Sequence, residues 1–166
     1  QFRRFNTKNQ RKSQKFTNSD IKMQKKWLER TELLIKEQGI EKLQNANLLV
    51  VGLGGVGSFA AEFLARSGIG KMTIVDGDTV DITNINRQLP ALHSTVGKSK
   101  VEVVSERLLD INPELQLTKI NEFLNPERME EVIGSEKFDY ILDCIDSVTP
   151  KLALIITEKK KKIKIV

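Results

Sequence analysis

Residues 48–58 read Leu-Leu-Val-Val-Gly-Leu-Gly-Gly-Val-Gly-Ser, a short apolar strand that runs directly into a glycine-rich turn. The glycines let the backbone turn tightly and approach a phosphate closely. The helix that follows presents unpaired N–H groups and the positive end of its dipole at the same point. A glycine pattern alone also fits a tight turn without a ligand, but its position between a strand and a helix favours a nucleotide site. The predicted binding residues are Gly52, Gly54, Gly55, Gly57 and Ser58.

Strand and helix patterns alternate along the rest of the chain. The predicted strands are compact apolar runs at Leu48–Val51, Met72–Val75, Leu115–Ile120, Tyr140–Cys144 and Ile163–Val166. The predicted helices between them cover Gly55–Ser67, Lys98–Asp110, Pro126–Ile133 and Thr149–Lys160. Each crossover helix must bury one face of the sheet, so apolar strands in this order lie parallel and are covered on both sides. We therefore predict an α/β fold, a Rossmann-like and mostly parallel sheet with helices on both faces.

The segment before the first strand divides into two parts. Residues 1–20 hold few apolar side chains among many basic and polar ones, and we expect a basic disordered arm there. From residue 21 apolar residues fall at helical spacing, Gly39 is expected to end that helix, and a short helical turn then runs through Leu43. Residues 21–166 are thus predicted to form one nucleotide-binding domain. We expect this domain to be incomplete, because the chain opens on Gln1 and stops within an apolar run.

Charge is concentrated at the two ends of the chain. The formal net charge is +5, but residues 1–26 carry a net +8 and the lysines at 159–162 and 164 add +5, which leaves −8 for the centre. A basic arm of this kind suits a polyanion such as RNA. A solvated tail that binds nothing is the alternative.

Composition argues against several classes of protein. The single cysteine, Cys144, cannot form an internal disulfide and offers no metal-ligand cluster, which fits the cytoplasm. The longest apolar stretch, residues 48–61, is interrupted by glycines and followed by charges, so we expect no stable membrane association. Cys144 lies within a predicted strand and is expected to pack there rather than to act as a nucleophile. His93, the only histidine, is expected on a loop surface.

A carboxylate follows the second predicted strand. Asp76 stands 19 residues beyond Gly57, where it can accept hydrogen bonds from ribose hydroxyls. Up to this point, both NAD and ATP fit the pattern. The polar loop at residues 78–88 favours ATP, because a nicotinamide-binding unit of this type does not need it.

That loop contains Asn84-Ile85-Asn86-Arg87-Gln88, and with it the chain resembles the ThiF/MoeB/HesA family of ubiquitin-activating-type adenylating enzymes. The family has a GxGGxG turn, an acidic residue that ends the next strand, an Asn-x-x-Arg-Gln loop, a lysine in the following helix and a late aspartate. The matching elements here are, in order, Gly52–Gly57, Asp76, Asn84–Gln88, Lys100 and Asp146.

The resemblance implies ATP and Mg²⁺ as cofactors and gives the matched residues roles. Arg87 and Lys100 are implied as catalytic phosphate ligands, the arginine through its bidentate fork and the lysine as a point charge. Asp146 is implied as a catalytic residue and as the Mg²⁺ ligand. Asn84 and Gln88 are implied to make polar contacts to the nucleotide or to the loop itself.

Arg30, ahead of the core, resembles a family arginine that reaches across a homodimer to the partner's phosphates. Taken singly, these residues also have plainer interpretations. Arg87 or Lys100 could be a surface charge, Asp146 could cap the helix that starts near Pro150, and Arg30 could pair with carboxylates of its own helix. The order of all the elements together favours the site.

Three further stretches resemble one branch of the family, namely Asp146–Lys151, Gly68–Gly70 and Ile111–Pro113. That branch dehydrates N6-threonylcarbamoyladenosine in tRNA. The resemblance implies that ATP adenylates the threonyl carboxylate and that attack from within the modification expels AMP and closes a ring. It implies tRNA bearing this nucleoside, and a second copy of the chain, as partners.

Three alternatives stay open on the sequence. The chain could belong to an adenylyltransferase for a sulfur-carrier or ubiquitin-like protein, which would also use ATP. An NAD-dependent oxidoreductase and a non-catalytic RNA-binding segment are more distant possibilities. Pyrophosphate exchange with ATP separates the two adenylating functions from the others.

Overall fold

The structure is a computed structural model, and it describes residues 26–161 and 163–166. The predicted basic arm at residues 1–20 and the first residues of the predicted helix lie outside the described residues. None of the helices in the described ranges has the length and apolar character that crossing a membrane requires.

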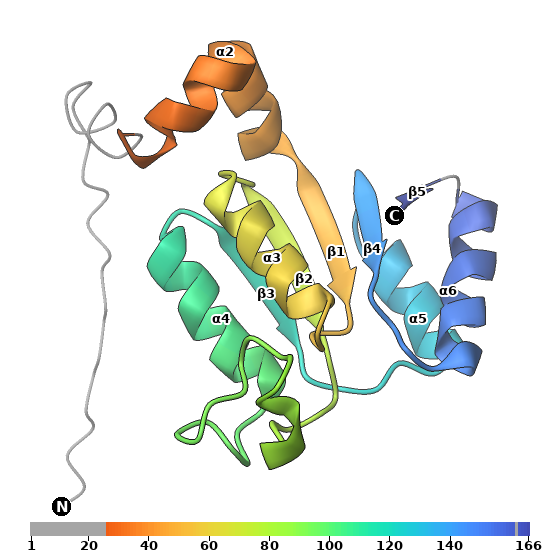
Figure 1. Cartoon of the computed structure of the whole chain (residues 1–166). Helices are drawn as coiled ribbons and strands as arrows, with labels where there is room; N and C mark the ends of the chain where they lie inside the picture. The colour runs from red at the N-terminus through yellow and green to blue at the C-terminus, as the bar shows by residue number, and fades with distance from the viewer. Residues whose placement is uncertain (1–25, 162) are drawn as a thin grey trace, which may run out of the picture.

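Five parallel strands form one sheet in the order β3-β2-β1-β4-β5 (Figure 1). They are β1 (Asn47–Val51), β2 (Lys71–Val75), β3 (Gln116–Ile120), β4 (Tyr140–Asp143) and β5 (Lys164–Ile165). The register sets Val51 beside Val75 on one side and Asp143 on the other, so the carboxyl ends of the three central strands are level. The chain winds in opposite directions on the two sides of β1, and open sheets of this kind bind ligands at that switch point. The predicted Rossmann-like fold is confirmed.

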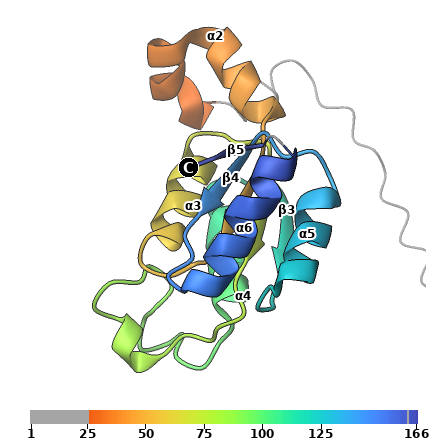
Figure 2. The same ribbon diagram turned by 90° about the vertical axis from the view of Figure 1, so that its right-hand side faces the viewer.

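Two pairs of helices cover the sheet, one pair on each face (Figures 1 and 2). They are α3 (Gly57–Arg66) and α4 (Lys100–Ile111) on one face, and α5 (Pro126–Gly134) and α6 (Val148–Lys161) on the other. Strand β1 sends Leu48 and Val50 into the first layer and Leu49 and Val51 into the second. Because both of its faces are buried, the strand is apolar at every position from Leu48 to Val51, after the polar Asn47 at its start.

The helix before the sheet differs from the prediction. A short η1 (Lys26–Leu28) leads into α2 (Glu29–Asn45), which continues past Gly39, so the prediction that Gly39 ends the helix is wrong. The break lies at Lys36, whose backbone adopts φ +65°. The kink brings Ile35 against Gly39, where a Cβ would lie only 2.6 Å from the Cβ of Ile35. The glycine therefore makes room for the kink and does not terminate the helix.

Two of the stretches that resemble the dehydrating branch meet at the amino edge of the sheet. The buried side chain of Asn112 donates a hydrogen bond to the carbonyl of Ile69 at 3.0 Å. Leu28 of η1 packs over Gly68 in the same place. These residues anchor the helical segment before β1 to the domain.

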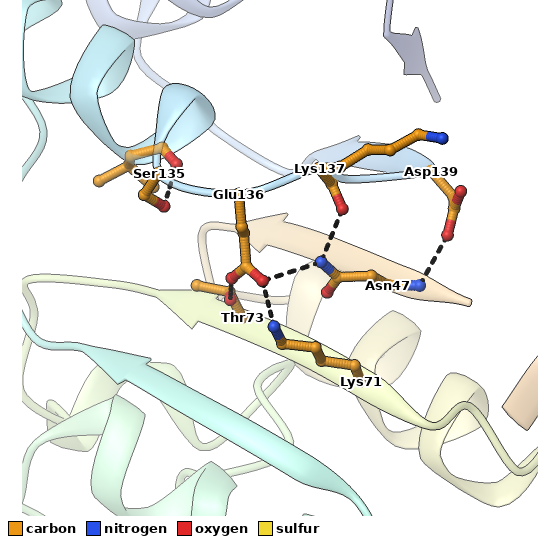
Figure 3. Close-up of polar contacts among 8 residues, drawn as sticks. Asn47, Lys71, Thr73, Ser135, Glu136, Lys137 and Asp139 are labelled. Carbon is orange, nitrogen blue, oxygen red and sulfur yellow. Dashed lines mark hydrogen bonds and ion pairs between the residues drawn. The ribbon is translucent and has the colours of Figure 1, made fainter. Parts of the chain in front are cut away.

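A polar network fastens the connection between α5 and β4 to the same edge (Figure 3). Glu136 accepts hydrogen bonds from Lys71, from the amide of Asn47 at 3.0 Å and from the hydroxyl of Thr73 at 3.3 Å. Burial raises the pKa of Glu136, but these donors together hold it below its usual value. The backbone N–H of Asn47 also donates to Asp139 at 2.9 Å. The network lies opposite the glycine-rich turn and is structural.

A second charged group joins α3 to α4. Glu62, which is nearly buried, accepts hydrogen bonds from Arg107 at 3.1 Å and from Arg66 at 2.8 Å. The hydrogen bond from Arg107 is the largest influence, and with Arg66 it lowers the pKa of Glu62 against the opposing effect of burial.

We expect Glu62→Gln to lower the free energy of unfolding at pH 7 by about 1 kcal/mol, since both arginines are half exposed and solvent screens the pair. Because the folded-state pKa lies below the ordinary value of 4.5, the stabilisation is present above that pH and is lost as the pH falls through the lower, folded-state value. Thermal unfolding of both proteins between pH 3 and 7 measures this, with Glu106→Gln on the exposed side of α4 as control. A difference that does not shrink in acid would contradict the assignment.

Candidate functional site

The glycine-rich turn after β1 is fixed by its own backbone. Gly52 has φ +92°, and its N–H donates to the carbonyl of Val75 at 2.8 Å. A Cβ on Gly57 would lie 1.8 Å from the carbonyl oxygen of Gly52. These two positions therefore require glycine for folding. Around Gly54, by contrast, the Nε2 of Gln88, at 3.8 Å, is the only atom of the described residues, apart from the two chain neighbours, within 4 Å of an added Cβ, so this part of the turn is open to a ligand.

Ser58 braces the turn from inside. Its side chain is fully buried, and the hydroxyl donates to the carbonyl of Gly54 at 2.5 Å. The predicted role of Ser58 in nucleotide binding is therefore indirect: its hydroxyl bonds to the backbone and fixes the shape of the turn. The N-terminus of α3 follows directly and supplies the helix dipole.

Asp76 lies at the end of β2 and ties the turn to the neighbouring loop. One carboxylate oxygen accepts a hydrogen bond from the N–H of Leu53 at 2.6 Å, and the other accepts one from the N–H of Asp78 at 2.8 Å. Each oxygen of a carboxylate has a second lone pair. Asp76 is half-buried, so it can hold the turn and still accept hydrogen bonds from ribose hydroxyls.

The loop after β2 is built around a capping box. Asp81 accepts hydrogen bonds from the N–H and the hydroxyl of Thr83 at 2.8 and 2.6 Å, and these bonds lower its pKa, the hydroxyl having the larger effect. Asn84 accepts from the N–H of Asp81 at 3.1 Å and completes the short helix η2 (Ile82–Asn84). Of the two roles expected for Asn84, the structure shows the contact within the loop.

The end of this loop lies against the glycine-rich turn. The carbonyl of Arg87 lies 3.4 Å from the Cβ position of Gly55. The Arg87 guanidinium is exposed and uses one nitrogen for the carbonyl of Thr83 at 3.2 Å and the amide oxygen of Asn86 at 2.9 Å. The amide oxygen of Gln88 is buried and has no partner among the described residues. Arg87 and Gln88 therefore stand at the open side of the turn, with hydrogen-bonding capacity to spare.

Lys100 completes this side of the site from the N-terminus of α4. The side chain is nearly buried, and its ammonium lies 2.8 Å from the carboxylate of Asp78. Sequence analysis did not single out Asp78; its position two residues beyond Asp76 in the polar loop is the only signal that could have drawn attention to it.

The third strand end carries Asp143 and, shortly after it, Asp146. Asp143 accepts from the N–H of Ile145 at 3.1 Å and pairs with Lys151 of α6 at 2.6 Å. Asp146 is exposed and forms no hydrogen bond or ion pair within the described ranges. The structure thus gives no support to a capping role for Asp146.

The other residues considered in the sequence are Cys144, His93 and Arg30. Cys144 is a half-buried free thiol whose pKa is raised, mainly by burial and secondarily by the charge of Asp143, so it is a poor nucleophile. His93 is exposed in its loop. Arg30 is exposed on α2, which lies at the amino edge of the sheet, away from the turn (Figure 1). Within one copy of the chain, the structure does not bring Arg30 to the other site residues.

A comparison with known families covers this whole site. Residues 28–166, which include the turn and every residue assigned to it, match the ThiF family. The chain belongs to the ThiF family. Its sequence is 48% identical over 126 residues to tRNA threonylcarbamoyladenosine dehydratase of Bacillus subtilis, which covers 76% of this chain and 49% of the relative. It is 40% identical over 112 residues to molybdopterin-synthase adenylyltransferase of Salmonella typhimurium, covering 68% of the chain and 44% of that relative.

The fold of this ThiF-family chain is also found among solved structures. It superposes on the Escherichia coli tRNA N6-threonylcarbamoyladenosine dehydratase TcdA, crystallised in complex with ATP, with a TM-score of 0.82 and 40% identity. The match covers 90% of this chain and 59% of that structure. The chain spans about half the length of the curated relatives that it matches.

Proposed function

We propose that this ThiF-family chain binds ATP and belongs to an enzyme that adenylates the threonyl carboxylate of N6-threonylcarbamoyladenosine in tRNA. The observation that carries the proposal is the meeting of four features at one edge of the sheet: an open glycine turn, the Asp76 carboxylate, and the cations Arg87 and Lys100. The relative crystallised with ATP has the same fold. High identity to dehydratases supports the choice of substrate.

In the proposed reaction, a carboxylate oxygen attacks the α-phosphorus of ATP, and the bond to pyrophosphate breaks. Both reactants are anions, so the site must neutralise charge and hold them in line. Asp76 would hold the ribose, while Arg87 and Lys100 would bind the phosphates. An atom within the modification then attacks the activated carboxyl carbon, and AMP leaves with the carboxylate oxygen. The sum is the loss of one water from the nucleoside, with ATP converted to AMP and pyrophosphate.

The site offers Mg²⁺ one carboxylate ligand. Asp146 offers an exposed carboxylate with no partner in the described chain, and no group of three or more His, Cys, Asp or Glu side chains there could enclose an ion. Mg²⁺ typically binds through one or two carboxylates together with substrate phosphates and water. When bound beside Asp146, the ion would neutralise charge on the phosphates.

We infer a second copy of the chain as a further partner. Arg30 is exposed on α2, a helix that lies at the edge of the sheet away from the site (Figure 1), and this position suits a role at the partner's phosphates. If Arg30 acts this way, mixing Arg30→Ala with a phosphate-site variant should restore one competent site in each mixed dimer. Activity that is not rescued on mixing would contradict the role in trans.

We propose that the basic arm, residues 1–20, contacts tRNA. We expect the protein to act in the cytoplasm. Removing residues 1–20 should weaken tRNA binding and flatten its dependence on salt, because fewer counterions are released when fewer phosphates are neutralised. Filter binding between 50 and 200 mM salt measures the slope. An unchanged slope would support the solvated tail instead.

The similarity to a molybdopterin-synthase adenylyltransferase supports a second candidate function, the adenylation of a carrier protein's C-terminus. Pyrophosphate exchange with labelled ATP tests both. Exchange that requires threonylcarbamoylated tRNA supports the first function, exchange that requires a carrier protein supports the second, and no exchange with either rejects adenylation.

A further inference from the structure

Lys100 occupies an uncommon environment for a lysine. Its side chain is 6% exposed, and the Oδ2 of Asp78 lies 2.8 Å from its ammonium. The structure gives no second acceptor for the ammonium within residues 26–161 and 163–166. An ammonium has three N–H donors. Asp78 therefore leaves two of these donors for another acceptor, such as a phosphate.

Asp78 is connected to both ends of the candidate site. Its N–H donates to Asp76 at 2.8 Å, and its carbonyl accepts from the N–H of Lys100 at 3.0 Å. Its side chain is half exposed, while the cation that it holds is buried. One residue thus links the carboxylate at the end of β2 to the first turn of α4.

We propose that Asp78 is a positioning residue, whose carboxylate holds the Lys100 ammonium where the phosphates of the nucleotide bind. This inference rests on the proposed function, since it assumes that Lys100 is a phosphate ligand. Asp78 itself need not touch the nucleotide. It acts through Lys100.

The physical reason is the cost of a buried charge that has lost its partner. A lysine has a long, flexible stem and does not hold its ammonium in place unaided. Without the Asp78 carboxylate, the Lys100 side chain can recover solvation only by leaving its buried position. The phosphates would then lose the contact, although Lys100 itself would still be present.

The test compares ligands that differ in phosphate. Calorimetry would measure adenosine, AMP and ATP binding to the protein that carries this chain and to its Asp78→Ala, Lys100→Ala and doubly substituted variants. We expect Asp78→Ala to weaken ATP binding about tenfold, the effect of losing one charged hydrogen bond, and to leave adenosine binding within about twofold of the parent. We expect the double variant to bind ATP no worse than Lys100→Ala, because residues that act through one another are not additive. Asp110→Asn, near the far end of α4, is the charge-matched control.

Three results would overturn the proposal: an equal loss for adenosine and ATP, additive losses in the double variant, or ATP binding in Asp78→Ala as tight as in the parent. If Asp78→Ala does not fold, Asp78→Asn takes its place, since it keeps the oxygen acceptor and removes only the charge. The same criteria apply to it. If the parent protein binds no ATP, the proposed function fails; if the parent binds and one of the three results appears, only the role of Asp78 fails.

Discussion

Gly54→Val is expected to abolish ATP binding while the protein remains folded. Gly54 is not among the glycines with a positive φ, and of the described residues beyond its chain neighbours only the Gln88 amide lies within 4 Å of an added Cβ, so the folded chain can accept a side chain there. A valine would instead fill the space in which a phosphate approaches the backbone N–H groups. Hydrogen bonds to a charged group contribute about 1.5–3 kcal/mol each, so losing two of them weakens binding by roughly a hundredfold or more. Calorimetry with ATP, beside a thermal unfolding curve, measures both effects.

Gly57→Val is the comparison that separates binding from folding. An added Cβ there would lie 1.8 Å from the carbonyl oxygen of Gly52 and 2.9 Å from the Cβ of Cys144, so this variant should lose stability as well as ATP binding. Normal ATP affinity in Gly54→Val would show that the phosphate does not bind at this turn. A loss of stability in Gly54→Val as large as in Gly57→Val would show that the fold cannot accept a side chain at Gly54.

Asp146→Asn is expected to keep the fold and to lose nearly all Mg²⁺-dependent turnover. The side chain is exposed and forms no hydrogen bond or ion pair within the described ranges, so its replacement costs the fold little. A neutral amide is a much weaker ligand than a carboxylate for a hard cation. We expect turnover to fall by about a hundredfold, with thermal stability unchanged.

Titration of turnover with Mg²⁺ and with Mn²⁺ measures this prediction, with Asp110→Asn as the control for a lost surface charge. A parental Mg²⁺ dependence in Asp146→Asn would remove Asp146 from the metal site. A large loss of stability would mean that the carboxylate has a structural role that the structure does not show.

The parts of the fold that follow from local sequence were predictable. Leu48–Val51 is apolar at every position, as expected of a strand buried on both faces, and the glycine-rich turn after it marks where the strand ends. Asp76 was predicted to follow the second strand, and the structure has it directly after β2, which ends at Val75.

The features that depend on contacts between distant residues were not predictable. The kink at Lys36 is a separate case, because it lies within one helix. A glycine in a helical pattern is interpreted more simply as the end of the helix than as the residue that makes room for a kink. The pair Asp78–Lys100 joins the loop after β2 to α4 across 22 residues, and the pair Asp143–Lys151 joins the end of β4 to α6 across 8 residues. Charged residues of this kind look like ordinary surface residues until the fold brings them together.

In the proposed function ATP activates a carboxylate on modified tRNA, and the products of that reaction can be measured. The protein that carries this chain is incubated with ATP, Mg²⁺ and tRNA bearing N6-threonylcarbamoyladenosine. The mass of the modified nucleoside is then measured by mass spectrometry, and the nucleotide products are separated and identified. We expect each nucleoside to lose one water for each AMP and pyrophosphate formed, and we expect neither product with tRNA that lacks the modification. ADP and phosphate as products, or AMP formed equally without the modified nucleoside, would contradict it.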